Sequence, residues 1–257
     1  MYLVDLPYSR MKILSDQTLP LIRCLEIYGR CAPDGVKWSP VTDPTTSPRC
    51  AECPGTYCRS APIEKLKTEA LPAYCPMRIN TDTIKLSANQ YSDNDVKEIY
   101  VNAAATEKGA FRTTLGVPRV VKSRIEQLAD FGKLQGIEKM GVAFCVALRD
   151  EASRLVEMLK EQGFDVASVC CKCGAADKAS LGVPEEYKTK GKHVFEAACN
   201  PILQAEMLNR AGAQVNIIVG LCVGHDMLFT KNSKAPVTTL IVKDRLLGHN
   251  PIKGLKR

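Results

Sequence analysis

Cysteine is the residue type in this sequence that most clearly indicates chemistry. The chain has 257 residues and contains 12 cysteines. Clustered thiolates commonly bind a metal ion or an iron–sulfur cluster, and in a reducing compartment they do so more often than they form disulfides. Cys24 and Cys31 have no partner pattern and are interpreted as ordinary thiols. The others form two groups, one local in sequence and one dispersed.

The local group has the spacing C-x2-C-x4-C-x16-C. It consists of Cys50, Cys53, Cys58 and Cys75. Two cysteines two residues apart can chelate one metal from a tight turn, which Pro54 and Gly55 supply here. The second C-x2-C pair of a zinc ribbon is absent, and Pro76 follows the last cysteine as in many ferredoxin-type sites. We predict a four-thiolate site, with iron–sulfur slightly favoured over zinc. Four exposed free thiols are the disfavoured alternative, because such thiols are chemically vulnerable.

The elements that must position the dispersed cysteines alternate between strand and helix. Buried strands are predicted at 140–145, 164–171, 215–221 and 237–242, and amphipathic helices at 148–159 and 200–212. Two earlier helices are predicted, one capped near Asp93 and one beginning at Pro118 and ending before Gly136. This alternation predicts an α/β fold with a mostly parallel sheet flanked by helices.

The dispersed cysteines fall where these strands end or a helix begins. Cys145 ends the first strand, Cys170 and Cys171 end the second, Cys222 ends the third, and Cys199 directly precedes a helix. Ligands of open α/β sheets bind beyond the carboxyl ends of the strands. We therefore predict that Cys145, Cys199, Cys222 and either Cys170 or Cys171 share one metal centre. The alternative is that they are small apolar residues of the core.

Two further residues near these cysteines could take part. Gly220 and Gly224 flank Cys222 and allow close approach of a ligand to the backbone. His225 follows Cys222 at a spacing found among metal ligands, and is a candidate ligand or proton donor or else a structural histidine. Cys173 is either a spare ligand or a free thiol.

Composition and charge limit the class of protein. The net charge is +7, and residues 231–257 contribute 7 − 1 = +6 of it. No aromatic side chain lies among those bases, so this segment is interpreted as a solvated tail and nucleic acid is disfavoured as a partner. An anionic substrate or an acidic redox partner is the alternative. No apolar run approaches the roughly 20 residues that span a bilayer, and no signal peptide is evident, which predicts a cytoplasmic protein.

Three parts are predicted along the chain. Residues 1–49 form a proline-rich extension or linker, residues 50–80 form the four-cysteine metal-binding module with a short helix at 63–69, and residues 90–257 form the α/β domain. The dispersed cysteines all belong to the third part.

The order and spacing of the cysteine motifs resemble a known family. The motifs include Cys50-x2-Cys53, Cys58-Arg59, Cys75-Pro76-Met77-Arg78, Phe144-Cys145, Cys170-Cys171-Lys172, Cys199-Asn200-Pro201, VGLCVGHD at 219–226, KAPVTT at 234–239 and GHNP at 248–251. They resemble the bacterial and archaeal cysteine-rich proteins of the domain of unknown function DUF1847, over about residues 50–252. The resemblance implies a metal-binding protein, typical of anaerobes, without an established reaction.

Three hypotheses follow. The first is a cytoplasmic metalloprotein, favoured as iron–sulfur, with a redox or cluster-dependent role and an unidentified redox or protein partner. The second is a hydrolase or transferase that uses Cys222 or Cys199 as nucleophile with His225 as base. The third is a zinc-stabilised binding protein whose basic tail docks a partner.

Overall fold

The computed structural model describes residues 47–256. Cys24, Cys31 and nearly all of the predicted extension at 1–49 lie outside these residues. The chain divides into two compact units, one ending at Thr81 and the other beginning at Asp82. The predicted division into a metal-binding module at 50–80 and an α/β domain at 90–257 stays a prediction. The two compact units do not by themselves define what each part of the chain binds.

Residues 47–81, the described part of the first unit, contain little regular structure. Short 3-10 turns occur at Cys50–Glu52, Tyr57–Arg59, Ile63–Lys65 and Thr68–Ala70, and helix α2 spans Pro76–Ile79. The helix predicted at 63–69 is therefore wrong: Leu66 and Lys67, between the last two turns, have non-helical backbone angles. Leu71 is the one buried residue among 47–81. A core this small leaves the segment dependent on other stabilisation.

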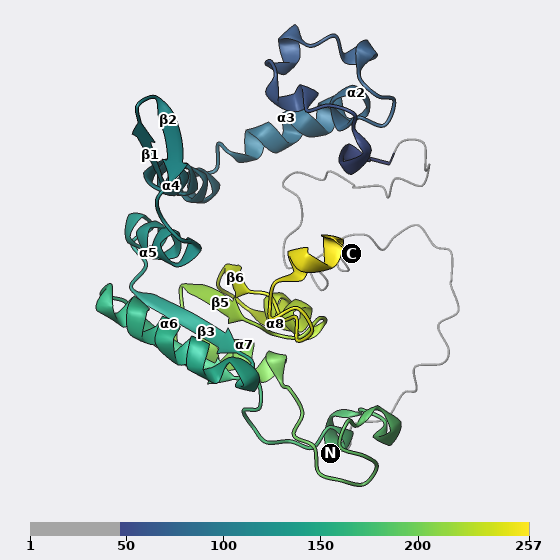
Figure 1. Ribbon diagram of the computed structural model, residues 1–257, viewed down its shortest axis with the longest axis vertical. Coiled ribbons are helices and arrows are strands. Elements are labelled where there is room, and N and C mark those ends of the chain that lie inside the picture. Colours follow the sequence, from purple (N-terminus) through teal and green to yellow (C-terminus); the bar gives the residue numbers. More distant parts are fainter. Residues whose placement is uncertain (1–46, 257) are drawn as a thin grey trace, which may run out of the picture. The chain divides into compact units, whose positions relative to one another are not determined.

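The second unit contains helices and six strands among its described residues (Figure 1). Its elements are α3 (Thr81–Gln90, whose first residue precedes the boundary), α4 (Asn94–Gly109), β1 (Phe111–Thr114), β2 (Val117–Val120), α5 (Arg124–Leu134), β3 (Lys139–Phe144), α6 (Arg149–Glu161), β4 (Asp165–Cys170), α7 (Pro201–Arg210), β5 (Val215–Val219), α8 (His225–Asn232) and β6 (Val237–Ile241).

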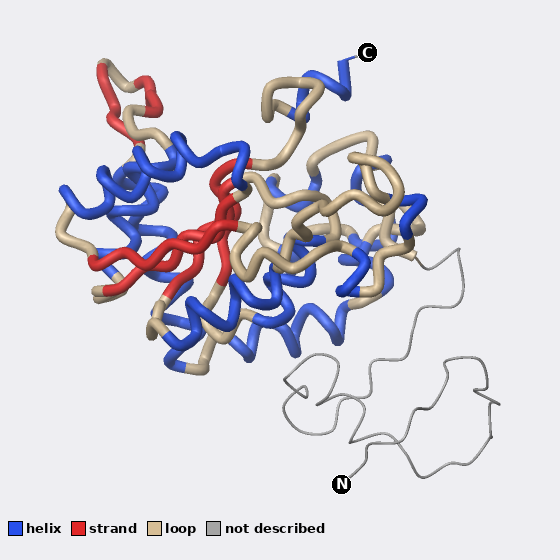
Figure 2. The backbone as a smooth tube through the Cα atoms, turned by 90° about the horizontal axis from the view of Figure 1, so that it is seen from below, coloured by secondary structure: helices blue, strands red, loops and turns tan. Residues whose placement is uncertain are grey.

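Four of these strands form a parallel sheet in the order β4-β3-β5-β6, which confirms the predicted fold class. Figure 2 shows these strands running side by side with helices around them. Apolar residues of α5 and α6 pack with Met140 and Ile217 in one core cluster. Residues of α7 and α8 pack with Ala143 and Ile218 in the other. The two helix pairs thus cover opposite faces of the sheet, because neighbouring strand residues point to opposite sides.

Local sequence signals explain where several helices begin. The Asp93 side chain accepts hydrogen bonds from the backbone of Asp95 and Val96, which caps α4. Ser123 and Glu126 form a reciprocal capping box at the start of α5. Asn200 caps α7, and Pro201 occupies its first turn. The starts of α4 and α7 agree with the sequence predictions.

The expectation about the start of the second helix was wrong. The predicted helix start at Pro118 is instead part of the antiparallel β1–β2 hairpin, and α5 begins only at Arg124. The hairpin turn is made by Leu115 and Gly116, which have φ of 52° and 77°. Such paired positive φ values are typical of tight hairpin turns, and Leu115 gives no sequence signal for one. The short helix α8 was also missing from the predictions.

None of the helices among residues 47–256 combines the length and apolar character needed to cross a membrane.

Candidate functional site

The sheet topology places a switch point beside the cysteines. Strands β3 and β5 are neighbours, but the helices that follow them, α6 and α8, pack on opposite faces of the sheet. Adjacent strands whose connections leave in opposite directions mark a topological switch point, where open α/β sheets bind ligands. Cys145 directly follows β3, and Cys222 lies in the loop between β5 and α8.

Backbone hydrogen bonds fix two cysteines at this edge. The N–H of Cys145 donates to the carbonyl of Val219 (3.1 Å), and the N–H of Cys171 donates to the carbonyl of Phe144 (2.8 Å). The parallel ladder thus continues one residue beyond the strands. Cys145 and Cys171 consequently end neighbouring strands at the same level.

Cys199 reaches the same edge through the start of α7. The N–H of Asn200 donates to the carbonyl of Cys171 at 2.8 Å, which ties the helix start to the end of β4. Because Cys199 directly precedes this capped helix start, the helix dipole favours its thiolate form.

The sulfur atoms and one imidazole contact one another in a chain. Cys171 lies beside Cys145 and Cys199, and their interaction raises the pKa of Cys171 and lowers the pKa of the other two. The next contact is between Cys199 and His225: it lowers the pKa of Cys199 further and raises that of His225. The N–H of Val146 also donates to Cys171 Sγ at 3.4 Å. The thiols of Cys145 and Cys199 therefore ionise more readily than that of Cys171.

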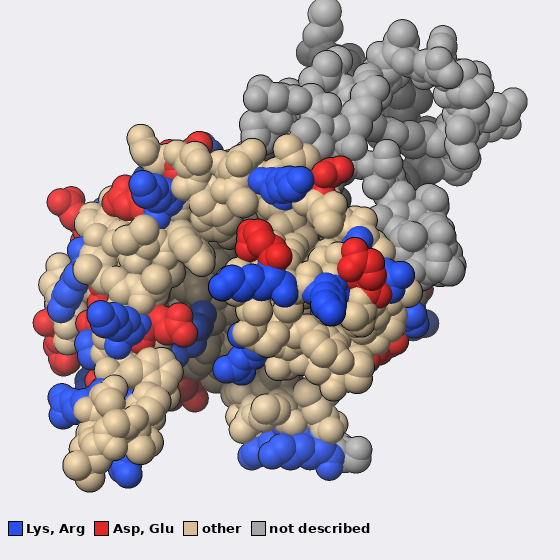
Figure 3. Space-filling view, turned by 90° about the horizontal axis from the view of Figure 1, so that it is seen from above, with Lys and Arg blue, Asp and Glu red and all other residues tan. Residues whose placement is uncertain are grey.

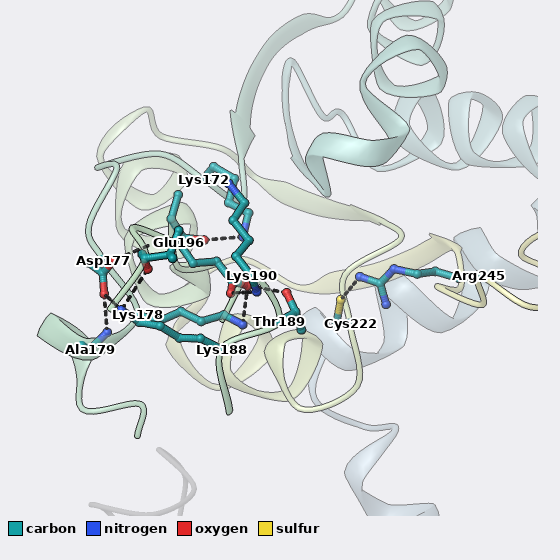
Figure 4. Close-up of polar contacts among 12 residues, drawn as sticks. Lys172, Asp177, Lys178, Ala179, Lys188, Thr189, Lys190, Glu196, Cys222 and Arg245 are labelled. Atoms are coloured by element: carbon teal, nitrogen blue, oxygen red, sulfur yellow. Dashed lines mark hydrogen bonds and ion pairs between the residues drawn. The ribbon is translucent and has the colours of Figure 1, made fainter. Parts of the chain in front are cut away.

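Cations of the chain surround these sulfurs. Lys243 Nζ donates to Cys145 Sγ at 3.3 Å, and Arg245 Nη2 donates to Cys222 Sγ at 3.4 Å (Figure 4). Lys172 Nζ donates to the carbonyl of Ala197 at 2.6 Å and lies near enough to lower the pKa of Cys199. The sequence interpretation of 231–257 as a solvated tail is therefore wrong for Lys243, which is half-buried against Cys145, whereas Arg245 is exposed. These three cations were missed, although Lys172 adjoins a cysteine and the other two follow the last strand of the sheet.

The structure separates the predicted residues of the dispersed group. It brings Cys145, Cys171, Cys199 and His225 into the contact chain, and it places Cys222 against Arg245. Cys170 is not in the contact chain, although it packs against the apolar cluster beneath α7 and α8 to which Cys145 and Cys171 belong, and Cys173 is exposed. Among residues 47–256, no three or more histidine, cysteine, aspartate or glutamate side chains are grouped closely enough to hold a metal ion. Metal ligation by this group stays a prediction.

The four cysteines at positions 50, 53, 58 and 75 lie on or beside the short turns of the first unit. Cys50 and Cys58 are exposed, whereas Cys53 and Cys75 are half-buried. The Tyr74 hydroxyl donates to the carbonyl of Glu52 at 3.0 Å, so the first turn lies near the residue before Cys75. Arg49 stacks over the Tyr74 ring at 4.5 Å. These contacts bring the turn at Cys50–Glu52 close to the residue that precedes Cys75. The four-thiolate site itself stays a prediction.

The loop between Cys171 and Cys199 is held by buried charges. Lys188, whose side chain is 3% exposed, pairs with Asp177 at 2.7 Å and with Glu185 at 3.0 Å. Glu196 pairs with Lys178 at 2.7 Å and accepts a hydrogen bond from Thr189 at 2.8 Å (Figure 4). The N–H of Glu196 donates to Asp177, which links the two halves of the network. The loop is thereby anchored next to the cysteine edge.

This network predicts that acid loosens the loop. Hydrogen bonds from Lys188 lower the pKa of Asp177 to about 2, and hydrogen bonds from Lys178 lower that of Glu196 to about 2. A lowered folded-state pKa contributes stability that is present above the ordinary carboxyl pKa and lost as the pH falls through the folded value. We expect hydrogen exchange at 177–196, corrected for the intrinsic rate, to accelerate between about pH 4.5 and pH 2. In Lys188→Met the loop should already exchange rapidly at neutral pH; a loop insensitive to both changes would contradict this prediction.

Charges elsewhere do not form a single patch on the face that Figure 3 shows, where basic and acidic side chains are interspersed. A separate cavity of about 350 Å³ lies between α4, α5 and strands β5 and β6, with Ile99, Phe131 and Leu240 in its wall. It contains no cysteine or histidine, so the chemistry-bearing side chains belong to the cysteine edge.

Comparison with known proteins supports a family relationship. An uncharacterized protein of Methanocaldococcus jannaschii is 51% identical over 129 residues, which cover 50% of this chain and 64% of that relative. A family described as "Protein of unknown function (DUF1847)" matches residues 75–240. This range includes Cys75 and the whole contact chain but ends before Lys243 and Arg245. Since the match covers well over half of the sequence, the chain belongs to the DUF1847 family.

Proposed function

We propose that the carboxyl edge of the sheet is a thiolate metal centre with a redox role, of the iron–sulfur class in preference to zinc. The observation that carries this proposal is the contact chain in which Cys171 lies beside both Cys145 and Cys199. The lowered pKa values of Cys145 and Cys199 favour their thiolate forms. A thiophilic metal can bind these sulfurs and neutralise their charge.

The donor set fits such a group. Thiolate sulfur and imidazole nitrogen are the ligands of zinc and of iron–sulfur centres, and no carboxylate takes part in the chain of contacts. Cys145, Cys171 and Cys199 would hold the group, with His225 or Cys222 as a further ligand. These ligand side chains contact one another in a row. To bind one metal they would therefore have to move so that all of them face the same point.

Each of the remaining side chains has a definable task at this centre. An iron–sulfur group would supply one-electron transfer. Lys243 and Arg245 donate hydrogen bonds to sulfurs, and hydrogen bonds of this kind tune the potential of a bound cluster. His225 can accept or release a proton beside Cys199. The four-cysteine segment 50–75 would be a structural site or an electron relay. A cytoplasmic location and a redox protein as partner complete the proposal, because these thiolates must stay reduced.

Anaerobic purification tests this proposal. We expect brown protein that contains iron and acid-labile sulfide, with an absorption band that bleaches on addition of dithionite. Protein that contains zinc and no iron would contradict the iron–sulfur assignment and support zinc as the metal of this centre. Protein that is colourless and metal-free after anaerobic purification would contradict both.

A second function is favoured by one specific contact. Cys199 and His225 lie next to each other and shift each other's pKa, as the nucleophile and base of a cysteine hydrolase or transferase do. Of the two candidate nucleophiles, the geometry favours Cys199 over Cys222, whose Sγ contacts Arg245. Stoichiometric alkylation of Cys199 in colourless wild-type protein, with a rate that follows the ionisation of His225, would support this function instead.

A further inference from the structure

The segment that follows β6 brings two permanent cations to the cysteine edge. Lys243 reaches Cys145 Sγ (3.3 Å), and Arg245 reaches Cys222 Sγ (3.4 Å). The Lys243 stem lies beside Gly220, at an ordinary van der Waals distance from the position that a Cβ on this residue would occupy. We call residues 242–250 the cationic clasp.

Hydrogen bonds within the clasp hold its shape. The N–H of Asp244 donates to His249 Nδ1 at 3.1 Å, and the N–H of His249 donates to the carbonyl of Asp244 at 2.7 Å. The Asp244 carboxylate accepts a hydrogen bond from the N–H of Leu247 at 2.9 Å. His249 itself has a φ of 62°, which closes the turn. Asp244 lies between the two cations, so His249 fixes the backbone that aims them.

Neither cation is neutralised by a carboxylate. Within residues 47–256, Lys243 and Arg245 make no ion pair with an aspartate or glutamate. Asp244 and Asp226 are the nearby acids in sequence, and the hydrogen bonds of their carboxylates go to the N–H groups of Leu247 and Met227. Lys172 adds a third positive charge near Cys199. Three basic side chains thus lie among the ionisable thiols of this edge.

Arg245 also has donors to spare. One guanidinium nitrogen donates to Cys222, whereas the side chain is exposed and a guanidinium carries five N–H groups in a planar fork. That fork matches the two oxygens of a carboxylate or phosphate. An anion bound there would lie directly beside the Cys222 sulfur.

We propose that the cationic clasp makes this edge a binding site for a small anion that carries a carboxylate or phosphate group, held by Arg245 next to Cys222. The proposal deepens the proposed function, since it names the substrate class of the same site. It also assigns the GHNP motif, whose His249 is a positioning residue that acts through Asp244.

Two alkylating reagents test this in metal-free, reduced protein. Iodoacetate carries a carboxylate, whereas iodoacetamide is neutral. The rate of iodoacetate divided by the rate of iodoacetamide at one cysteine therefore measures how strongly an anion is attracted to that cysteine. Both reagents react with the same thiolate, so the fraction of the thiol that is ionised does not affect this ratio. We expect the ratio at Cys222 to exceed that at the exposed Cys173 by on the order of 10-fold at low salt, and to fall with ionic strength. Both cysteines are read by mass spectrometry in the same sample.

Matched variants locate the effect. Lys243→Gln/Arg245→Gln should reduce the Cys222 ratio to that of Cys173, whereas Lys253→Gln/Lys256→Gln, which removes the same charge from the end of the chain, should leave it high. His249→Ala should lower the ratio without removing a lysine or arginine, and His249→Asn should restore it, because asparagine accepts a hydrogen bond and tolerates positive φ.

The outcome is independent of the metal proposal, because metal-free protein is used. Equal ratios at Cys222 and Cys173 in the wild type would overturn the anion site. So would a high Cys222 ratio that survives Lys243→Gln/Arg245→Gln. Circular dichroism of each variant verifies that the fold is retained, and the iodoacetamide rate alone verifies that Cys222 stays accessible.

Discussion

Replacing Cys171 by serine should abolish metal binding at the carboxyl edge of the sheet. Cys171 is the sulfur that contacts both Cys145 and Cys199, so its loss leaves the two thiolates without a common partner. Changes in residues that merely support a ligand already weaken metal sites about 10–100-fold, and loss of this ligand should exceed that range. Metal analysis of anaerobically purified protein should show that the metal of this centre is missing while that of residues 50–75 remains.

Two neighbouring cysteines provide matched controls for this prediction. Cys173→Ser removes an exposed thiol from the same loop, and Cys170→Ser removes one that packs against the apolar cluster. Both variants should retain the metal. Full metal content in Cys171→Ser, or equal losses in all three variants, would show that the contact chain is not the ligand set.

Replacing Cys53 by serine should remove the metal of the first unit and unfold that unit. Leu71 is its one buried residue among 47–81, and ordering the backbone costs about 1–2 kcal/mol per residue. A bound structural metal can offset this cost, since such binding contributes about 10–16 kcal/mol to folding in zinc-finger peptides. Limited proteolysis should therefore cleave the Cys53→Ser protein within residues 50–80 and spare the unit from Asp82 onward.

Cys173→Ser is again the control, because it removes a thiol from the second unit. The Cys53→Ser protein should lose the metal of one centre and retain that of the other. If its metal content and its proteolysis pattern match those of the wild type, the four cysteines at 50–75 are not a metal-nucleated module.

Much of the second unit could be predicted because its signals are local. Alternating apolar segments gave the four parallel strands, and the capping residues Asp93 and Asn200 gave the starts of α4 and α7. The β1–β2 hairpin was missed because its turn depends on a positive φ at Leu115, which residue type does not reveal. The helix predicted at 63–69 did not form for a different reason. A short polar segment that has few packing contacts does not sustain a full helix.

The candidate site shows the same division between local and tertiary information. The sequence by itself determined which cysteines lie at strand and helix ends, since that depends on short-range apolar patterns. Only the tertiary structure decided that Cys171 rather than Cys170 contacts Cys145 and Cys199, because these contacts join residues that are distant in sequence. It also decided that Lys243 and Arg245 lie against Cys145 and Cys222. Those contacts join residues distant in sequence, and they arise because parallel strands bring all their carboxyl ends to one edge.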